Sequence, residues 1–255
     1  MKTKAIMNLK GGTAKTVTAI NMAAILSRDY DKRVLLVDAD SQCNLTEFMT
    51  ADMPKKVPTD RGLADILRGR GGEIRPTAFP GVDLIPATDE LMELDTTTVK
   101  AGQSDPMQLA DFLQGAAETY DFCLIDCPPA FSASAIAALL AADDVLIPMK
   151  LDAFGLRGMA NLLTQIRNMQ RVNPALTVGG ILPTMYYQTQ QMDEAEKLLR
   201  DSGLPVFPHI RRSVKVDDMT FAQLPLIKSS PKSNACKDYR RFVRKMLEGG
   251  ENHGV

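Results

Sequence analysis

Short apolar runs alternate with longer stretches in which apolar positions recur at the helical period. The short runs are rich in Val, Ile and Leu without strict alternation, which is typical of strands covered on both faces of a parallel sheet. The predicted strands are Lys4–Asn8, Val34–Asp38, Val82–Ile85, Phe122–Asp126, Val145–Met149 and Val178–Leu182, and the predicted helices are Lys15–Ser27, Gln108–Thr119, Ser134–Ala142, Leu156–Gln170, Met192–Ser202 and Asn234–Leu247.

The alternation of strand and helix predicts an α/β fold: a doubly wound, mostly parallel sheet with helices on both faces, in a single domain. The stretch Met53–Arg75 is expected to be loop-rich, with one short helix around Leu63–Leu67. We expect the domain to cover residues 1–248 and residues 249–255 to form a flexible tail.

Composition narrows the class of protein. The 255 residues are 45% hydrophobic and 24% charged, which is typical of a soluble globular protein with a sizeable core. Four cysteines without a CxxC pair, beside two histidines, argue against a zinc site and fit a reducing cytoplasm. The chain shows no signal peptide and no run of the roughly 20 apolar residues that a membrane span needs. We therefore expect a cytoplasmic protein.

A glycine-containing loop, Lys10–Thr16, joins the first predicted strand to the first predicted helix. Strand, glycine loop and helix is the context of a phosphate-binding loop. Gly11 and Gly12 allow a sharp turn that points backbone N–H groups inward, and the helix N-terminus favours an anion. Lys15 can reach the β and γ phosphates, and the Thr16 hydroxyl can ligate Mg²⁺.

The loop departs from the common pattern GxxxxGK[ST] because Ala14 stands before Lys15. We expect Ala14 to keep its backbone N–H available for phosphate and to avoid the positive φ values that glycine tolerates. The alternative interpretation of the loop alone is an ordinary Gly-Gly turn between a strand and a helix.

Carboxylates follow two other predicted strands. Val34–Val37 leads into Asp38 and Asp40, and Phe122–Ile125 leads into Asp126. In open α/β sheets ligands bind at the carboxyl ends of the strands. A single such Asp could be a helix cap. Three of them beside a glycine loop favour a site for phosphate and a metal ion.

Three motifs in this order resemble the ParA/MinD family of deviant Walker ATPases, most closely the ParA and Soj-type partition proteins. The family loop reads KGG-x-x-K-[ST] with an extra lysine, here Lys10. The later motifs match Asp38-x-Asp40-x-Gln42 and Asp126-Cys127-Pro128-Pro129, and Ile181–Thr184 resembles the strand that leads to the family's adenine pocket. The resemblance is nearly full length and weakest over Met53–Asp105.

The resemblance implies a P-loop NTPase that hydrolyses ATP with Mg²⁺ as an ATP-induced homodimer. It implies that Lys15 and Thr16 hold phosphate and metal, and that Asp38 and Asp126 support the metal shell. Asp40 would position the attacking water. Lys10 would act across the dimer interface. The nucleotide-binding residues that the resemblance implies are Lys10, Gly11, Gly12, Thr13, Ala14, Lys15, Thr16, Val17 and Pro183.

Further departures from the family pattern are Val17 in place of a threonine, Ser41 in place of a proline, and Asp217-Asp218-Met219 in place of a Ser-Glu-Ala-Pro run. They bear on turnover rate and partners rather than on the reaction.

The C-terminal region is strongly basic. Between His209 and Lys245 ten basic residues stand against three acidic ones, a net charge of +7 in a chain of net charge -1. This asymmetry favours contact with DNA phosphates, and no base-reading motif is present. The alternative is a solvated helix face. The candidate DNA-binding residues are Arg211, Arg212, Lys215, Lys237, Arg240, Arg241 and Arg244.

The family further implies non-specific double-stranded DNA binding by the ATP-bound dimer, association with the nucleoid, and a centromere-binding ParB-like partner that stimulates slow hydrolysis. The main alternative is a MinD-like ATPase at a membrane, which the acidic, glycine-rich C-terminus disfavours. A role as an iron–sulfur electron-transfer protein is disfavoured, because this chain lacks suitably placed cysteines. The residues Lys10, Lys15, Asp40 and Asp126 together argue against a non-catalytic nucleotide-binding scaffold. The short segment before the loop argues against an added operator-binding domain.

Overall fold

The computed structural model describes residues 1–51, 61–96 and 104–251. Within these residues the chain forms a seven-stranded sheet of order β3-β4-β2-β5-β1-β6-β7. The edge strand β3 runs antiparallel to β4, and the other neighbours are parallel. The strands are β1 (Lys2–Ile6), β2 (Val34–Asp38), β3 (Arg75–Pro76), β4 (Val82–Ile85), β5 (Phe122–Asp126), β6 (Asp144–Lys150) and β7 (Thr177–Thr184).

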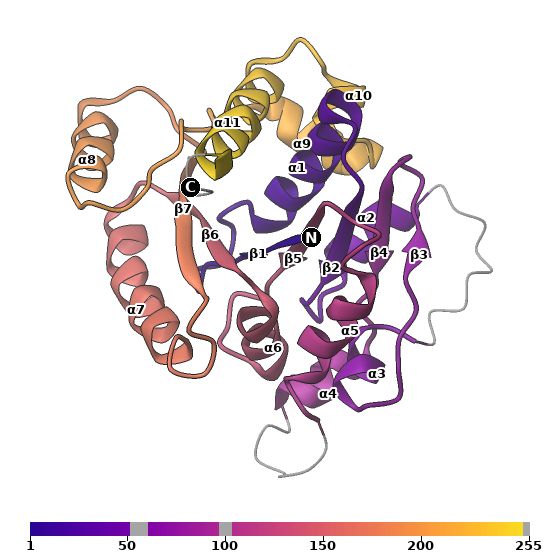
Figure 1. Cartoon of the computed structure of the whole chain (residues 1–255). Helices are drawn as coiled ribbons and strands as arrows, with labels where there is room; N and C mark the ends of the chain where they lie inside the picture. Colours follow the sequence, from indigo (N-terminus) through magenta and orange to yellow (C-terminus); the bar gives the residue numbers. More distant parts are fainter. Residues whose placement is uncertain (52–60, 97–103, 252–255) are drawn as a thin grey trace.

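Helices cover both faces of the sheet (Figure 1). The first face is covered by α3 (Leu63–Leu67), α4 (Glu90–Thr96), α5 (Gln108–Ala116), α6 (Ala133–Ala141) and α7 (Ala153–Met169), and the second by α1 (Lys15–Tyr30), α2 (Asn44–Thr50), α9 (Val214–Ala222), α10 (Leu226–Ser229) and α11 (Asn234–Glu251). The remaining helix, α8 (Gln190–Arg200), packs Met192 and Leu199 into the core of the first face.

Each face of the sheet has its own hydrophobic core, because successive side chains along a strand point to opposite faces. In β2, Leu35 and Val37 belong to the core of the first face, whereas Val34 and Leu36 belong to that of the second. All four side chains are fully buried. This explains why the strands are apolar without alternation, since both faces of a parallel sheet are covered.

The predicted fold class is confirmed, and every predicted strand and helix is present. The structure adds short elements that were not predicted, namely β3, α2, α4, α9 and α10, because elements of two to nine residues are too short to show a clear period. Helix α11 includes Gly249 and Gly250 and ends at Glu251, three residues past the expected domain boundary at residue 248. The rest of the expected tail, 252–255, lies outside the described residues. None of the described helices is both long enough and apolar enough to span a membrane.

Candidate nucleotide and magnesium site

The predicted phosphate loop lies between β1 and the N-terminus of α1, as the motif requires. Gly12 has φ 68 and Ala14 has φ 66, so both adopt the left-handed conformation. The expectation that Ala14 avoids positive φ is therefore wrong. Ala14 is the N-cap of α1, and its carbonyl accepts the N–H of Thr18 at 2.9 Å. The loop imposes the glycine conformation on an alanine so that this helix can start directly at Lys15.

Two residues that the sequence did not single out as site residues hold the loop in place. The Asn8 side chain donates to the carbonyl of Pro148 at 2.8 Å and accepts the N–H of Lys10 at 2.9 Å. The Thr184 hydroxyl donates to the carbonyl of Thr13 at 3.1 Å. These bonds join the loop to the ends of β6 and β7. Of these two residues, only Thr184 could have been found from the sequence, because it ends the run Ile181–Thr184 that resembles the family pattern.

Lys15 and Asp126 interact electrostatically at the phosphate loop. Lys15 is buried, and its ammonium donates to the carbonyl of Lys10 at 3.4 Å. Burial lowers the pKa of Lys15, and the negative charge of Asp126 opposes this effect. Burial raises the pKa of Asp126 well above its ordinary value, and the neighbouring Asp38 adds to this, whereas Thr16 and Lys15 lower it.

The Asp126 carboxylate fits a magnesium-bound nucleotide. Both of its oxygens are buried, and neither has a partner at hydrogen-bond distance and angle among the described residues. The Thr16 hydroxyl is the nearby donor, and its interaction lowers the pKa of Asp126. A buried carboxylate without a partner is costly unless a cation or donor meets it. No group of three or more His, Cys, Asp and Glu in the described chain could hold a metal by itself. Mg²⁺ at a phosphate site is commonly held by one or two protein groups together with phosphates and water.

Asp38 lies next to Asp126, since the two residues are partners at the ends of β2 and β5. Its carboxylate accepts the Thr46 N–H at 2.8 Å, the Thr46 hydroxyl at 2.7 Å and the Asp40 N–H at 3.2 Å. Burial raises the pKa of Asp38 to about 6, although the bonds from Thr46 oppose it. Asp38 thus ties α2 to the site and orients the backbone that carries Asp40.

Asp40 is only partly buried and accepts the Gln42 N–H at 3.0 Å. Its charge raises the pKa of both Asp38 and Asp126, which places it among the acidic groups of the site.

Lys10 is held within its own chain. Its ammonium donates to both carboxylate oxygens of Asp152 at 2.9 Å. Asp152 is also the N-cap of α7 through the Gly155 N–H at 2.7 Å, and Lys150 lies 3.4 Å away. Burial would raise the pKa of Asp152, but the bonds from Lys10 and Gly155 outweigh it and lower that pKa. The sequence did not single out Asp152.

The two remaining predicted nucleotide contacts flank the phosphate loop. Val17 is in the first turn of α1 and packs against the core of the second face. Pro183 is in β7, opposite Met149, and its carbonyl accepts the N–H of Ile210.

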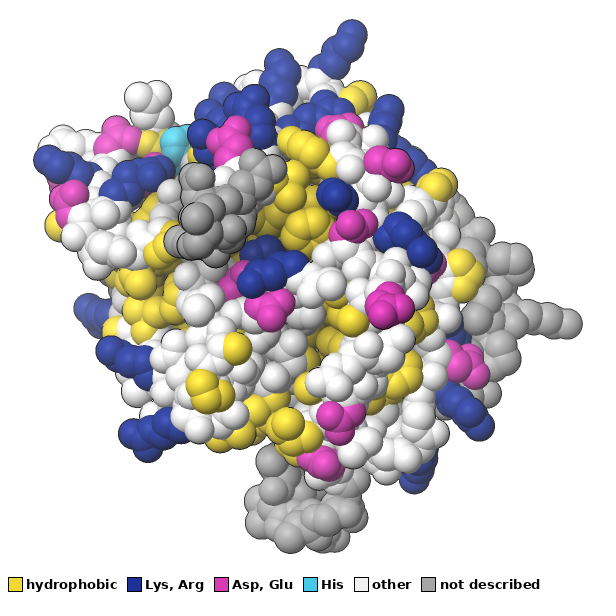
Figure 2. All heavy atoms as spheres, in the orientation of Figure 1, with side chains coloured by type: hydrophobic (Ala, Val, Ile, Leu, Met, Phe, Trp, Pro, Cys, Tyr) yellow, Lys and Arg dark blue, Asp and Glu magenta, His cyan; other side chains and the backbone are white. Residues whose placement is uncertain are grey.

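The basic residues gather over α10 and α11, at the top of the view in Figure 2. Several of them serve the fold. Arg211 binds the buried carboxylate of Asp238 with two bonds of 2.8 Å, and Arg241 contacts the same carboxylate at 3.2 Å. Arg240 binds Asp29 at 2.8 Å. Other predicted DNA-binding residues have surface carboxylates nearby, with Lys215 at 2.8 Å from Asp218 and Arg244 at 3.8 Å from Glu248.

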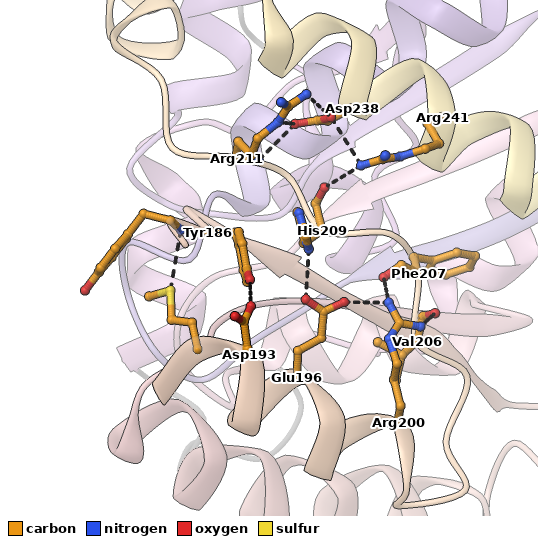
Figure 3. Close-up of polar contacts among 12 residues, drawn as sticks. Tyr186, Asp193, Glu196, Arg200, Val206, Phe207, His209, Arg211, Asp238 and Arg241 are labelled. Atoms are coloured by element: carbon orange, nitrogen blue, oxygen red, sulfur yellow. Dashed lines mark hydrogen bonds and ion pairs between the residues drawn. The ribbon is translucent and has the colours of Figure 1, made fainter. Parts of the chain in front are cut away.

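The segment before α9 connects this basic surface to α8 (Figure 3). The His209 ring stacks on Tyr186, with centroids 3.7 Å apart, and its Nδ1 lies 2.8 Å from Glu196. The Tyr186 hydroxyl donates to Asp193. Arg241 donates to the His209 carbonyl at 3.4 Å. Polar contacts therefore join α8 to α11 through one connecting segment.

The comparisons of sequence and of structure point to the same group of proteins. An AAA domain family model matches residues 1–178. The chain is 31% identical over 255 residues to the sporulation initiation inhibitor protein Soj of Bacillus subtilis, covering 96% of this chain and 98% of that protein. It is 35% identical over 247 residues to the chromosome-partitioning ATPase Soj of Thermus thermophilus, covering 95% and 94%. Among solved structures it is similar to a variant of Cyanothece McdA in complex with ATP, with 26% identity, a TM-score of 0.82 and coverage of 97% and 96%.

Proposed function

Because this chain belongs to the ParA and Soj family of partition ATPases, we propose that it is a nucleotide-gated DNA-binding switch. In this proposal, an ATP-induced homodimer binds DNA non-specifically, and hydrolysis of ATP releases it. The observation that carries the proposal is the buried Asp126 carboxylate without a hydrogen-bond partner, beside Lys15 at the phosphate loop.

Each residue of the site has a role that its position supports. Lys15 and the N–H groups of the loop bind the β and γ phosphates, and Thr16 and Asp126 hold Mg²⁺ directly or through water. When bound, Mg²⁺ neutralises charge on the phosphates. Asp38 keeps α2 and Asp40 in place through its bonds to Thr46 and to the Asp40 N–H. Asp40 orients the attacking water.

Lys10 changes partner in the proposed cycle. In the single chain its ammonium is held near the loop by Asp152. In the dimer it reaches the nucleotide of the partner subunit and stabilises negative charge in the transition state. A two-fold axis then supplies both lysines.

DNA would lie on the basic surface of α9–α11. Neither Arg212 nor Lys237 lies within ion-pair distance of a carboxylate in the described part of the chain, and both are exposed. Arg212 and Lys237 are therefore the residues we assign to phosphate contact, with Arg241 and Arg244 beside them. Arg211 and Arg240 shape the surface through Asp238 and Asp29.

We further propose slow hydrolysis in the isolated protein, stimulation by a centromere-binding ParB-like partner, and association with the nucleoid in the ATP state. Release after hydrolysis follows if the dimer depends on the γ phosphate, because an interface ordered by that group weakens when it leaves.

Co-sedimentation with non-specific double-stranded DNA in ATP, ADP and no nucleotide tests the proposal. We expect binding in ATP only, retained by Asp40→Ala and weakened by salt. Arg212→Gln and Lys237→Gln should weaken binding, whereas Arg157→Gln, an exposed change on α7, should not. ATP hydrolysis without DNA binding in any nucleotide state would refute the switch, and binding to liposomes would then support a MinD-like role.

A further inference from the structure

A pocket lies at the end of the sheet opposite the phosphate loop. It has a volume of about 390 Å³, within the range of small-ligand pockets. It is formed where α1 ends, where β2 and β4 begin, and where α10 crosses them. Figure 1 shows α10 beside the far end of α1. Helix α1 has 16 residues, so the pocket is about 24 Å from the phosphate loop at 1.5 Å per residue.

The rim of this pocket is held by hydrogen bonds. The Ser27 hydroxyl donates to the Pro80 carbonyl at 2.6 Å. Gly81 has φ 75, and a Cβ there would come within 2.6 Å of the Ser27 hydroxyl. The Leu226 N–H donates to the Asn21 side chain at 2.9 Å, which fixes α10 on α1. The pocket is therefore formed before any ligand arrives, which lowers the entropic cost of binding.

The floor of the pocket is apolar, and a cation lies directly on it. Phe79, Val82 and Ile227 are 5%, 1% and 2% exposed. The Lys228 ammonium lies 4.4 Å from the centroid of the Phe79 ring. An ammonium on an aromatic face is attracted by the ring and keeps its charge available on the other side.

The remaining charges around the pocket are mostly positive. Four basic side chains and one acidic side chain, Asp31, line it. Lys32 lies 3.5 Å from Asp121, and Arg33 lies over the Tyr120 ring. Arg28 donates to the Ile227 carbonyl at 2.9 Å, which uses one of its five donors. Neither Arg28 nor Lys228 has a carboxylate within ion-pair distance in the described residues.

We propose that this pocket binds an amphipathic organic anion, a small molecule with a carboxylate or sulfonate next to an aliphatic or aromatic body. The anionic group meets Arg28 and Lys228, and the apolar body lies against the exposed Pro80 and the edges of Phe79 and Ile227 that line the pocket. The pocket combines an excess of positive charge at its rim with an apolar floor, and an amphipathic anion matches both features. The inference does not depend on ATP hydrolysis or DNA binding.

Fluorescence titration with 8-anilinonaphthalene-1-sulfonate tests the site in the full-length protein. N-phenyl-1-naphthylamine, which has the same aromatic body without the sulfonate, is the matched neutral probe. Decanoate serves as a competitor. The titrations are repeated with saturating Mg-ATP, because a dye can also enter a nucleotide pocket.

We expect one bound sulfonate dye per chain, displaced by decanoate and not by Mg-ATP. Because a charge-assisted hydrogen bond is lost in each case, Lys228→Gln and Arg28→Gln should each weaken dye binding by about tenfold. Lys228→Arg and the exposed control Lys232→Gln should bind as the wild type does. Should one glutamine variant misfold by circular dichroism, the other still decides.

Three results would overturn the proposal. They are equal binding of the neutral probe, displacement of the dye by Mg-ATP, or unchanged dye affinity in a folded glutamine variant.

Discussion

Replacing Ala14 by glycine should stabilise the protein in the absence of nucleotide. Ala14 has φ 66 and ψ 33, which places its Cβ against the following carbonyl. This conformation costs a residue with a side chain about 1–2 kcal/mol relative to glycine. Glycine in turn gains freedom in the unfolded chain, which lowers stability by about 0.4–1 kcal/mol.

The balance of these two effects favours Ala14→Gly by about 0.5–1 kcal/mol. For a domain of this size that raises Tm by about 1–4 °C. The measurement is thermal unfolding followed by circular dichroism without nucleotide or Mg²⁺, with urea unfolding as a second readout. Ala160→Gly is the matched control, because Ala160 is exposed in the middle of α7 and should lose about 1 kcal/mol as glycine.

The two substitutions are chemically identical and should act in opposite directions. If Ala14→Gly lowers Tm as much as Ala160→Gly does, the positive φ stores no strain. The reasoning about the loop would then be wrong.

Three other changes test the site and the basic surface. Asp152→Asn keeps a side-chain oxygen for the α7 cap and removes the charge that binds Lys10. The partly exposed pair holds about 0.5–1 kcal/mol in each subunit, so ATP-dependent dimerisation in analytical ultracentrifugation should tighten about five- to thirtyfold, and weaker dimerisation would contradict this. Asp126→Asn should raise Tm without Mg²⁺, because a neutral amide replaces a buried carboxylate whose charge is opposed by burial and by Asp38. It should also abolish the rise in Tm with Mg-ATP, and a retained Mg-ATP effect would exclude Asp126 from the metal site. Asp238→Ala should lower the free energy of unfolding in urea by about 1–3 kcal/mol. The loss is smaller than for a fully buried ion pair because Arg211 is partly exposed. An unchanged free energy of unfolding would show that the pair does not stabilise the fold.

Local pattern predicted much of this protein. The apolar runs located the strands, and the two periods predicted a doubly wound sheet with helices on both faces. The loop Lys10–Thr16 and the strand-end Asp38 and Asp126 were found from sequence because strand, turn and carboxylate are local features. Their meeting at one edge also followed, since parallel strands bring their carboxyl ends together. The structure pairs Asp38 with Asp126 at that edge.

Only the tertiary structure showed which residues far apart in the sequence form ion pairs. Lys10 and Asp152 are 142 positions apart, and Arg211 and Asp238 are joined across the start of α11. The φ of Ala14 was mispredicted because alanine alone favours negative φ, whereas the bonds from Asn8 and Thr184 fix the loop around it. Sequence periodicity reports which face of an element is buried. It does not report which side chains meet when two elements pack, because that depends on the register and angle of the packed elements.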